Sequence, residues 1–256
     1  MNDITFFMLA HKRAKATDFA LSTVRKSYPF NKIILFENGS NVLKDTCIKY
    51  NVEYHQQSVN FMSPLSGNPE GGIYAGMSKK TDFYLLYQQL KYVCEKASTK
   101  WLLFLEPDVV IRDTIKTFPN ASVGCTFRPC NKYKNNSFEH TYINNYRKEK
   151  GMEIFESYQC GCSGGSILNR EHLFAALSEA NKHVDNVVFT NGSYNYREIC
   201  HIDFYMSFLF IINGYKLEDW CEHYEDNKYN LKNFTKEQQY GRVFGAVVHD
   251  FKYFYD

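Results

Sequence analysis

Long apolar runs are absent from this chain of 256 residues. A helix that spans a bilayer needs about 20 apolar residues, and the apolar runs at residues 4–10 and 206–212 are far shorter. The first run also lacks a basic stretch before it and a small-residue cleavage site after it, so it does not resemble a signal peptide. We therefore expect no transmembrane segment and a cytoplasmic protein.

Cysteine is also scarce, and neither sign of charge predominates. Eight cysteines are too dilute for a disulfide framework, and no Cys-x-x-Cys pair offers a zinc site. The chain has 30 Lys and Arg against 28 Asp and Glu, and this balance disfavours a protein built to coat nucleic acid. The basic stretch at 132–150 also contains Glu139 and Glu149, which is more typical of a solvated loop. We expect reduced thiols and no nucleic-acid partner.

Three common functional motifs are missing as well: the Gly-x-Gly-x-x-Gly fingerprint, the P-loop and the Gly-x-Ser-x-Gly elbow. Aromatic residues, in contrast, are abundant at 17%. Aromatic rings fill cores and also stack on sugar-like ligands. We assign to the core Phe36, Phe83, Phe104, Phe174 and Phe208. We expect ligand contacts from a second set in polar stretches, namely Tyr74, Tyr133, Tyr142, Tyr146, Tyr158 and Trp220.

Strand and helix patterns alternate through the first half of the chain. Apolar runs predict strands at residues 4–10, 31–37, 52–55 and 101–105, and periodic spacing predicts helices at 17–28, 42–50 and 81–97. This alternation is typical of a mostly parallel sheet with helices on both faces. Residues 60–80 are rich in Gly and Pro, and a loop of this length is usually functional.

The second half is less regular. We predict strands at 122–128 and 243–248, a loop over 128–151, and a Gly-Gly strand segment at 161–168. Asn169 can cap one helix, and Gly214 can end another that covers 203–213. Residues 222–242 are polar and expected at the surface.

Two carboxylates, Glu106 and Asp108, directly follow the predicted strand at 101–105. Ligands of open α/β sheets bind outside the carboxyl ends of the strands. If the strand alternation continues, both side chains lie on one side. Two hard oxygen ligands suit Mg²⁺ or Mn²⁺. The alternative is an ordinary x-Pro-Asp turn at the end of the strand.

Three further positions can carry chemistry. His249 follows an apolar strand, and an imidazole in a mixed site favours Mn²⁺ over Mg²⁺, although a lone His is more often packed or at the surface. Asp203 opens an apolar helix, either as its N-cap or as a general base that takes a proton from a sugar hydroxyl. Glu37 and Asn38 end the second predicted strand, where they form either a nucleoside contact or a plain Asn-Gly turn.

The order of these elements resembles that of GT-A glycosyltransferases, over nearly the whole chain. Residues 33–40 are similar to the second strand of that family and the turn that contacts the nucleoside. Residues 106–108 are similar to its Asp-x-Asp motif, with Glu in the first place, and 162–166 to the small-residue segment behind the donor sugar. Compact size and the missing anchor resemble small soluble enzymes of bacteria or of large DNA viruses such as chloroviruses.

The resemblance implies a single GT-A domain over 1–256, an α/β fold whose mostly parallel central sheet is flanked by helices. Residues 1–113 would form a Rossmann-like half that binds the nucleotide sugar, and residues 114–256 an acceptor-binding and catalytic half. The implied activity is inverting transfer of a hexose or pentose from a UDP-sugar to a glycan or another hydroxyl acceptor. A viral enzyme would act in the host cytoplasm.

The resemblance also implies roles for individual residues. His11, Glu37 and Asn38 would hold the nucleotide, together with Glu106 and Asp108 through the metal. The Mn²⁺ or Mg²⁺ ligands would be Glu106, Asp108 and His249. Asp203 would be the catalytic base, with the pair Glu218 and Asp219 as the next candidates.

Two other functions remain open. A sugar-phosphate nucleotidyltransferase would carry a glycine-rich phosphate loop and a Lys near its N-terminus, and the His-Lys-Arg run at 11–13 lacks the glycines. A non-catalytic module that binds carbohydrate or nucleotide is compatible with the many aromatic residues, but would leave the carboxylate pair without a use.

Overall fold

The computed structural model describes residues 3–58, 63–64, 75–77, 79–127, 137–190, 193–194, 201–225 and 246–249. Most of the loop predicted at 60–80 and most of the polar stretch at 222–242 lie outside these residues. Tyr74 and Tyr133 lie outside them too.

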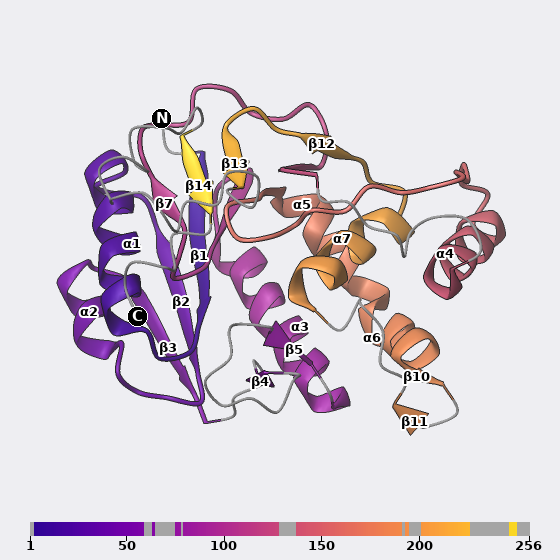
Figure 1. The fold of residues 1–256 in the computed structure, drawn as a ribbon, viewed down its shortest axis with the longest axis horizontal. Helices are drawn as coiled ribbons and strands as arrows, with labels where there is room; N and C mark the ends of the chain where they lie inside the picture. Colours follow the sequence, from indigo (N-terminus) through magenta and orange to yellow (C-terminus); the bar gives the residue numbers. More distant parts are fainter. Residues whose placement is uncertain are drawn as a thin grey trace, which may run out of the picture.

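The core of the fold is a seven-stranded sheet in the order β12-β8-β9-β6-β1-β2-β3. Its strands are β1 (Ile4–Ala10), β2 (Ile33–Asn38), β3 (Glu53–Gln57), β6 (Trp101–Leu105), β8 (Val123–Cys125), β9 (Ile167–Asn169) and β12 (Leu217–Asp219). β1 is parallel to β2 and β6, and only β9 runs against its two neighbours, β6 and β8. The mostly parallel α/β sheet predicted from the sequence is therefore confirmed (Figure 1).

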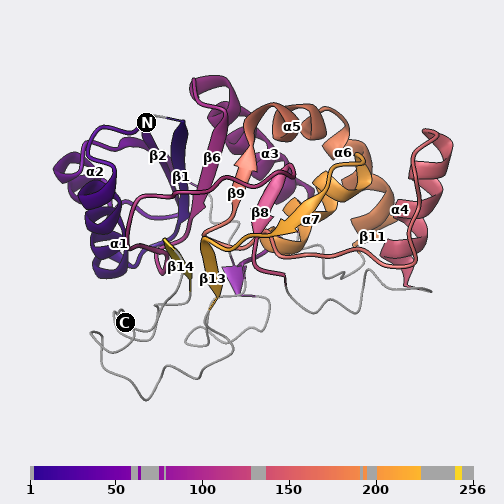
Figure 2. The ribbon, with the colours of Figure 1, turned by 90° about the horizontal axis from the view of Figure 1, so that it is seen from above.

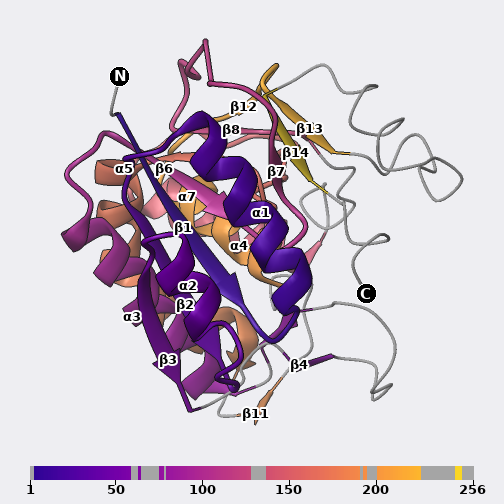
Figure 3. The same cartoon turned by 90° about the vertical axis from the view of Figure 1, so that its left-hand side faces the viewer.

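Helices cover both faces of this sheet. They are α1 (Ala14–Ser27), α2 (Lys44–Lys49), α3 (Lys80–Lys96), α4 (Phe138–Glu149), α5 (Arg170–Ala176), α6 (Ala180–His183) and α7 (Ile202–Ile212). A 3₁₀ turn, η1 (Leu177–Glu179), precedes α6, and a π-helical turn, η2 (Val184–Val188), follows it. The helices α1 and α2 lie in front of β1 and β2 in Figure 3, whereas α3, α5 and α7 pack on the opposite face.

The central strands are buried over their whole length, and this explains their continuous apolar sequence. All residues of β1, β2 and β6 are buried. Successive side chains of β1 alternate between the two faces: Phe6 and Met8 join the core under α1, and Phe7 and Leu9 join the core under α3 and α7. Because a strand covered on both faces has no exposed side, its sequence shows a continuous apolar run and no alternation of apolar and polar residues.

Smaller strands complete the described structure. β7 (Val110–Ile111), β14 (Val247–His249) and β13 (His223–Glu225) form a three-stranded sheet in which β14 is central. Figure 2 shows β13 and β14 side by side. Two short hairpins pair β4 (Ser63–Pro64) with β5 (Ala75–Gly76), and β10 (Phe189–Thr190) with β11 (Ser193–Tyr194).

The loop predicted over 128–151 is wrong for its second part, because α4 occupies 138–149. Ser137 caps this helix, and its hydroxyl accepts a hydrogen bond from the His140 N–H at 3.0 Å. The buried face of α4 carries Glu139, His140 and Arg147 beside its apolar residues. A helix whose buried face is partly polar shows only weak apolar periodicity, so the sequence pattern did not reveal it.

The division of the aromatic residues also needs correction. Phe36, Phe83, Phe104 and Phe208 lie in the core as predicted, but the Phe174 side chain on α5 is 46% exposed. Of the rings expected to line ligand sites, Tyr146, Tyr158 and Trp220 are instead buried in the core, and Tyr142 packs partly buried against it. Polar sequence around a ring does not place that ring at the surface, because distant segments cover it.

Candidate functional site

The carboxyl ends of β1, β2 and β6 meet at one edge of the sheet. The register pairs Ala10 with Glu37 and Met8 with Leu105, so the three strands end close to one another. Of the residues predicted in the first half, Glu37 and Asn38 are the last two residues of β2, whereas His11 follows β1 and Glu106 and Asp108 follow β6. The sheet therefore gathers them along a single edge, where ligands of open α/β sheets bind.

The loops that follow β1 and β2 are tied together by hydrogen bonds. The His11 Nδ1 lies 2.5 Å from the carbonyl oxygen of Asn38, and because a carbonyl only accepts, Nδ1 carries the proton. The Lys12 N–H donates to the Ser40 hydroxyl at 3.1 Å, and the buried Asn38 side chain accepts from Gln89 Nε2 at 2.8 Å. The two loops predicted to hold the nucleotide thus form one connected unit.

The turn after β1 has an unusual backbone. Lys12 and Arg13 both have a φ of 57°, a left-handed conformation that non-glycine residues rarely adopt. The helix α1 then starts at Ala14, three residues before the predicted cap Thr17, which is buried inside the helix. Such strained residues concentrate at functional sites, and sequence reasoning missed this turn because it contains no glycine.

Glu37 has a role that the sequence did not suggest. Its buried carboxylate accepts hydrogen bonds from the Ser40 hydroxyl, from the N–H groups of Val42 and Leu43 at 2.8 and 3.1 Å, and from the Tyr54 hydroxyl at 2.6 Å. Burial raises the pKa of Glu37, but these hydrogen bonds outweigh it and hold the pKa below the ordinary value. Glu37 therefore holds the loop after β2, and its contact to a nucleoside stays a prediction.

Glu106 and Asp108 lie in a turn and not on a continuing strand. β6 ends at Leu105, and the Val109 N–H donates to the Glu106 carbonyl at 3.0 Å. The strand alternation therefore stops before Glu106 and does not set the directions of these two side chains, so their placement on one side stays a prediction. The Asp108 side chain is 4% exposed, and Glu106 is half-buried.

A glycine segment packs directly against Glu106. A Cβ at Gly164 would lie 2.6 Å from Glu106 Oε2 and 2.9 Å from both Glu106 Cγ and Val109 Cγ2, so any larger residue would force the Glu106 side chain or Val109 to shift. The next residue, Gly165, has a φ of 91°, and its Cβ would lie 2.5 Å from the His223 ring. The Gly165 N–H donates to the Phe104 carbonyl at 2.7 Å, which fixes the segment beside β6. Because residues 161–166 are small, this segment fits between Glu106 and His223. The sequence analysis did not identify His223 as a residue near the site.

The first turn of α7 is bound to the same segment through Ser207. This buried hydroxyl accepts from the N–H groups of Gly161 and Cys162, each at 3.1 Å, and donates to the Asp203 carbonyl at 2.9 Å. The N-cap of α7 is His201, so Asp203 is not the N-cap and lies in the first turn. One short segment therefore packs against Glu106 at one end and is hydrogen-bonded at the other end to Ser207, four residues after Asp203 on α7.

Strand β14 ends at His249 next to β7. β14 pairs Val247 with Ile111 and Val248 with Val110, so His249 directly follows this antiparallel pairing, and Asp108 and Val109 directly precede it in the sequence. The side chain of His249 lies outside the described part of the structure. Among the side chains that are described, no three His, Cys, Asp or Glu residues gather as a metal site. The three-ligand metal site therefore stays a prediction, although the two carboxylates are the hard oxygen donors that Mn²⁺ and Mg²⁺ take.

The alternative bases, Glu218 and Asp219, have structural contacts on β12. The Glu218 carboxylate accepts from the N–H groups of Asn120 and Ala121 at 2.8 and 3.1 Å. Asp219 Oδ1 accepts from the Phe127 N–H at 3.3 Å. Both carboxylates therefore connect β12 by hydrogen bonds to the residues that precede and follow β8.

Within the residues that the structure describes, no helix has the length and apolar character needed to cross a bilayer.

Comparison with solved structures shows which fold this is. The chain is similar to a crystal structure of the galactosyltransferase LgtC in complex with donor and acceptor sugar analogues, with 14% identity and a TM-score of 0.53 over 96% of this chain and 86% of that chain. A structure of an active-site mutant of LgtC matches over the same shares with 13% identity and a TM-score of 0.51. No protein-family model and no curated protein matches the chain. The likeness shows a GT-A fold.

Proposed function

We propose that this chain is a glycosyltransferase that moves a sugar from a nucleotide-sugar donor to a hydroxyl group of an acceptor. One observation carries the proposal. The glycine segment at 161–166 joins the carboxylate of Glu106 to the first turn of α7, beside the strand ends that carry His11 and Asn38. That arrangement occurs in a fold shared with LgtC, whose structure was solved with donor and acceptor sugar analogues.

The donor would lie across the strand ends. The connected loops after β1 and β2 would contact the nucleoside. The basic residues Lys12 and Arg13 lie in the first of these loops, where their positive charges would attract the diphosphate. Glu106, Asp108 and His249 would hold Mn²⁺ or Mg²⁺, which supplies charge stabilisation for the leaving nucleotide when it is bound. The choice of UDP as the nucleotide rests on the sequence resemblance alone, and the cytoplasmic location rests on the sequence patterns at residues 4–10 and 206–212.

Asp203 would act as the general base. Its carboxylate takes the proton of the acceptor hydroxyl while the acceptor oxygen forms a bond to the anomeric carbon and the bond to the diphosphate breaks. Attack from the face opposite the leaving group inverts the configuration. Two facts support this role: Asp203 is half-buried, and the turn that carries it is fixed to the segment that touches Glu106.

An Asp203→Asn variant tests the base. General-base catalysis contributes about 10²- to 10⁴-fold, so we expect kcat to fall by at least about 100-fold with little change in donor KM. Asp18→Asn is a matched control, because Asp18 lies on α1, where its carboxylate pairs with Lys49 on α2 and has no proposed role in transfer. Proton NMR of the product reports the anomeric configuration. Near-normal turnover of Asp203→Asn, or retained configuration, would remove Asp203 from this role.

A further inference from the structure

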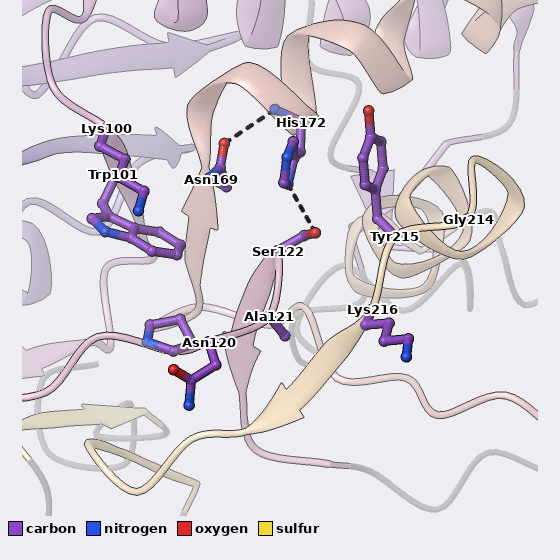
Figure 4. A pocket seen from close by; sticks show the side chains of 11 residues that line it. Lys100, Trp101, Asn120, Ala121, Ser122, Asn169, His172, Gly214, Tyr215 and Lys216 are labelled. Atoms are coloured by element: carbon purple, nitrogen blue, oxygen red, sulfur yellow. Dashed lines mark hydrogen bonds between the residues drawn. The ribbon is translucent and has the colours of Figure 1, made fainter.

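A cavity lies at the edge of the sheet opposite to the candidate active site. It has a volume of about 470 Å³ and is lined by the ends of four adjacent strands: the start of β6 at Trp101, the end of β9 at Asn169, and the residues before β8 and β12, Ser122 and Lys216 (Figure 4). Glu106 follows the other end of β6. The cavity is therefore separated from the candidate active site by the length of that strand.

The cavity is polar and carries positive charge. Lys100 lies at one end and Lys216 at the other, with Asn120 and Ser122 between them (Figure 4). No carboxylate is among its lining residues. The carboxylate of Glu218, two residues after Lys216, accepts hydrogen bonds from the N–H groups of Asn120 and Ala121. An anionic group in this cavity thus meets cations without a competing acid in its lining.

Lys100 is held beside the cavity by aromatic packing. Its ammonium lies 5.2 Å from the centre of the Trp101 ring. That ring is 4% exposed and stacks on Phe118, with 5.8 Å between the ring centres. In the described residues neither Lys100 nor Lys216 forms an ion pair within the chain. Both charges remain available for a ligand.

His172 and Ser122 add a fixed hydrogen-bond donor. The His172 Nδ1 lies 2.9 Å from the Ser122 hydroxyl oxygen, and the imidazole stacks on Tyr215 at 4.5 Å and 15°. A neutral imidazole and a hydroxyl have one donor each, and this contact uses one of them. Whichever tautomer is present, the pair keeps a second N–H or O–H donor. Stacking holds it in place before any ligand arrives.

We propose that this cavity binds a saccharide that carries an oxyanion, either a phosphate or a carboxylate. The two ammonium groups and the His172–Ser122 donor recognise the charge, and Asn120 and Tyr215 offer polar and aromatic contacts for the sugar ring. The volume falls in the range of about 300–1,000 Å³ that small-molecule sites occupy. The site is non-catalytic and stands apart from the proposed glycosyl transfer, so either proposal can fail alone.

Calorimetric titration of the full chain tests the site, with four probes: glucose 6-phosphate, glucuronate, neutral glucose and inorganic phosphate. We expect glucose 6-phosphate or glucuronate to bind at least about tenfold more tightly than glucose, a difference of about 1.4 kcal/mol, because hydrogen bonds to a charged group are stronger than those to a neutral hydroxyl. Comparing the two acids distinguishes phosphate from carboxylate recognition. We also expect inorganic phosphate to bind more weakly than the preferred acid, since it lacks the ring.

Variants assign the binding to this cavity. Lys100→Glu and Lys216→Glu should each weaken binding of the preferred acid by about tenfold or more. Lys91→Glu is the matched control, because Lys91 lies on α3 outside the cavity lining, and it should leave binding unchanged. Equal affinity for glucose, normal binding by both cavity variants, or no binding of either acid with a Kd below about 20 mM would each overturn the proposal. Thermal melting confirms that the variants are folded.

Discussion

Replacement of Ser207 by Ala tests how the candidate site is held together. The Ser207 hydroxyl is fully buried and makes three hydrogen bonds: it accepts from the Gly161 and Cys162 N–H groups at 3.1 Å and donates to the Asp203 carbonyl at 2.9 Å. Alanine keeps the backbone and most of the volume. The variant therefore removes one oxygen atom and leaves two buried N–H groups without their acceptor.

The expected loss of stability follows from those two groups. A buried donor without a partner costs about 1–3 kcal/mol, and partial relaxation of the segment makes about 2–4 kcal/mol a reasonable total for the pair. Urea unfolding of both proteins measures this difference. Ser22→Ala is the matched control, because the Ser22 hydroxyl donates to the Phe19 carbonyl within α1 and joins no second segment. We expect about 1 kcal/mol or less for that control.

Activity should respond separately from stability. Loosening residues 161–162 lets the turn with Asp203 move relative to Glu106, so we expect kcat to fall by about tenfold or more, as misplacement of a reacting group does. The donor KM should change little, because the loops after β1 and β2 keep their contacts. Kinetics well below the melting temperature separate the two effects. A free energy of unfolding within about 0.5 kcal/mol of that of the parent chain, together with an unchanged kcat, would refute this account of Ser207.

The remaining predictions concern the strand ends. Gly164→Ala would bring a Cβ within 2.6 Å of Glu106 Oε2. We expect the Mn²⁺ concentration for half-maximal turnover to rise about tenfold, because disturbing the groups around a metal ligand weakens metal binding. An unchanged Mn²⁺ titration contradicts this. The pKa of Glu37 is lowered in the folded chain, so its hydrogen bonds contribute full stability above the unfolded pKa of about 4.3 and lose it as the pH falls through the lower folded value. Glu37→Gln should therefore flatten the stability profile below about pH 4.3, and an unchanged slope in urea unfolding argues against it. Burial raises the pKa of Glu53, but hydrogen bonds from Tyr92, Lys32 and His55 lower it to about 2 overall. Glu53→Gln should therefore reduce the loss of folding stability between about pH 4.3 and 2. An unaltered stability profile over that pH range contradicts the assignment.

The sequence was most informative where a local signal decides the structure. The run at 101–105 became β6 without a shift of either end, and the helix predicted to stop before Gly214 ends at Ile212, with Gly214 at a φ of 82°. Both signals are local: a buried strand needs continuous apolar residues, and a left-handed residue after a helix favours glycine.

Features that depend on distant contacts could not be predicted. β9 has three residues, and only its pairing with β6 and β8 shows that it runs antiparallel. Glu37 was expected at a ligand, yet one of its partners is Tyr54 on the neighbouring strand. Trp220 is likewise buried by distant segments, and its indole N–H donates to the Thr117 carbonyl at 3.0 Å.

Donor cleavage is the measurement that tests the central claim most directly. The chain is incubated with a panel of nucleotide sugars and Mn²⁺, and released nucleoside diphosphate is quantified for the parent chain and for Asp108→Ala. We predict release from one donor, with UDP as the expected product, and a loss of at least about 100-fold in Asp108→Ala. Pyrophosphate release from UTP and a sugar phosphate would instead indicate a nucleotidyltransferase, and binding without turnover a non-catalytic module. Either result, or full activity in Asp108→Ala, would contradict the account.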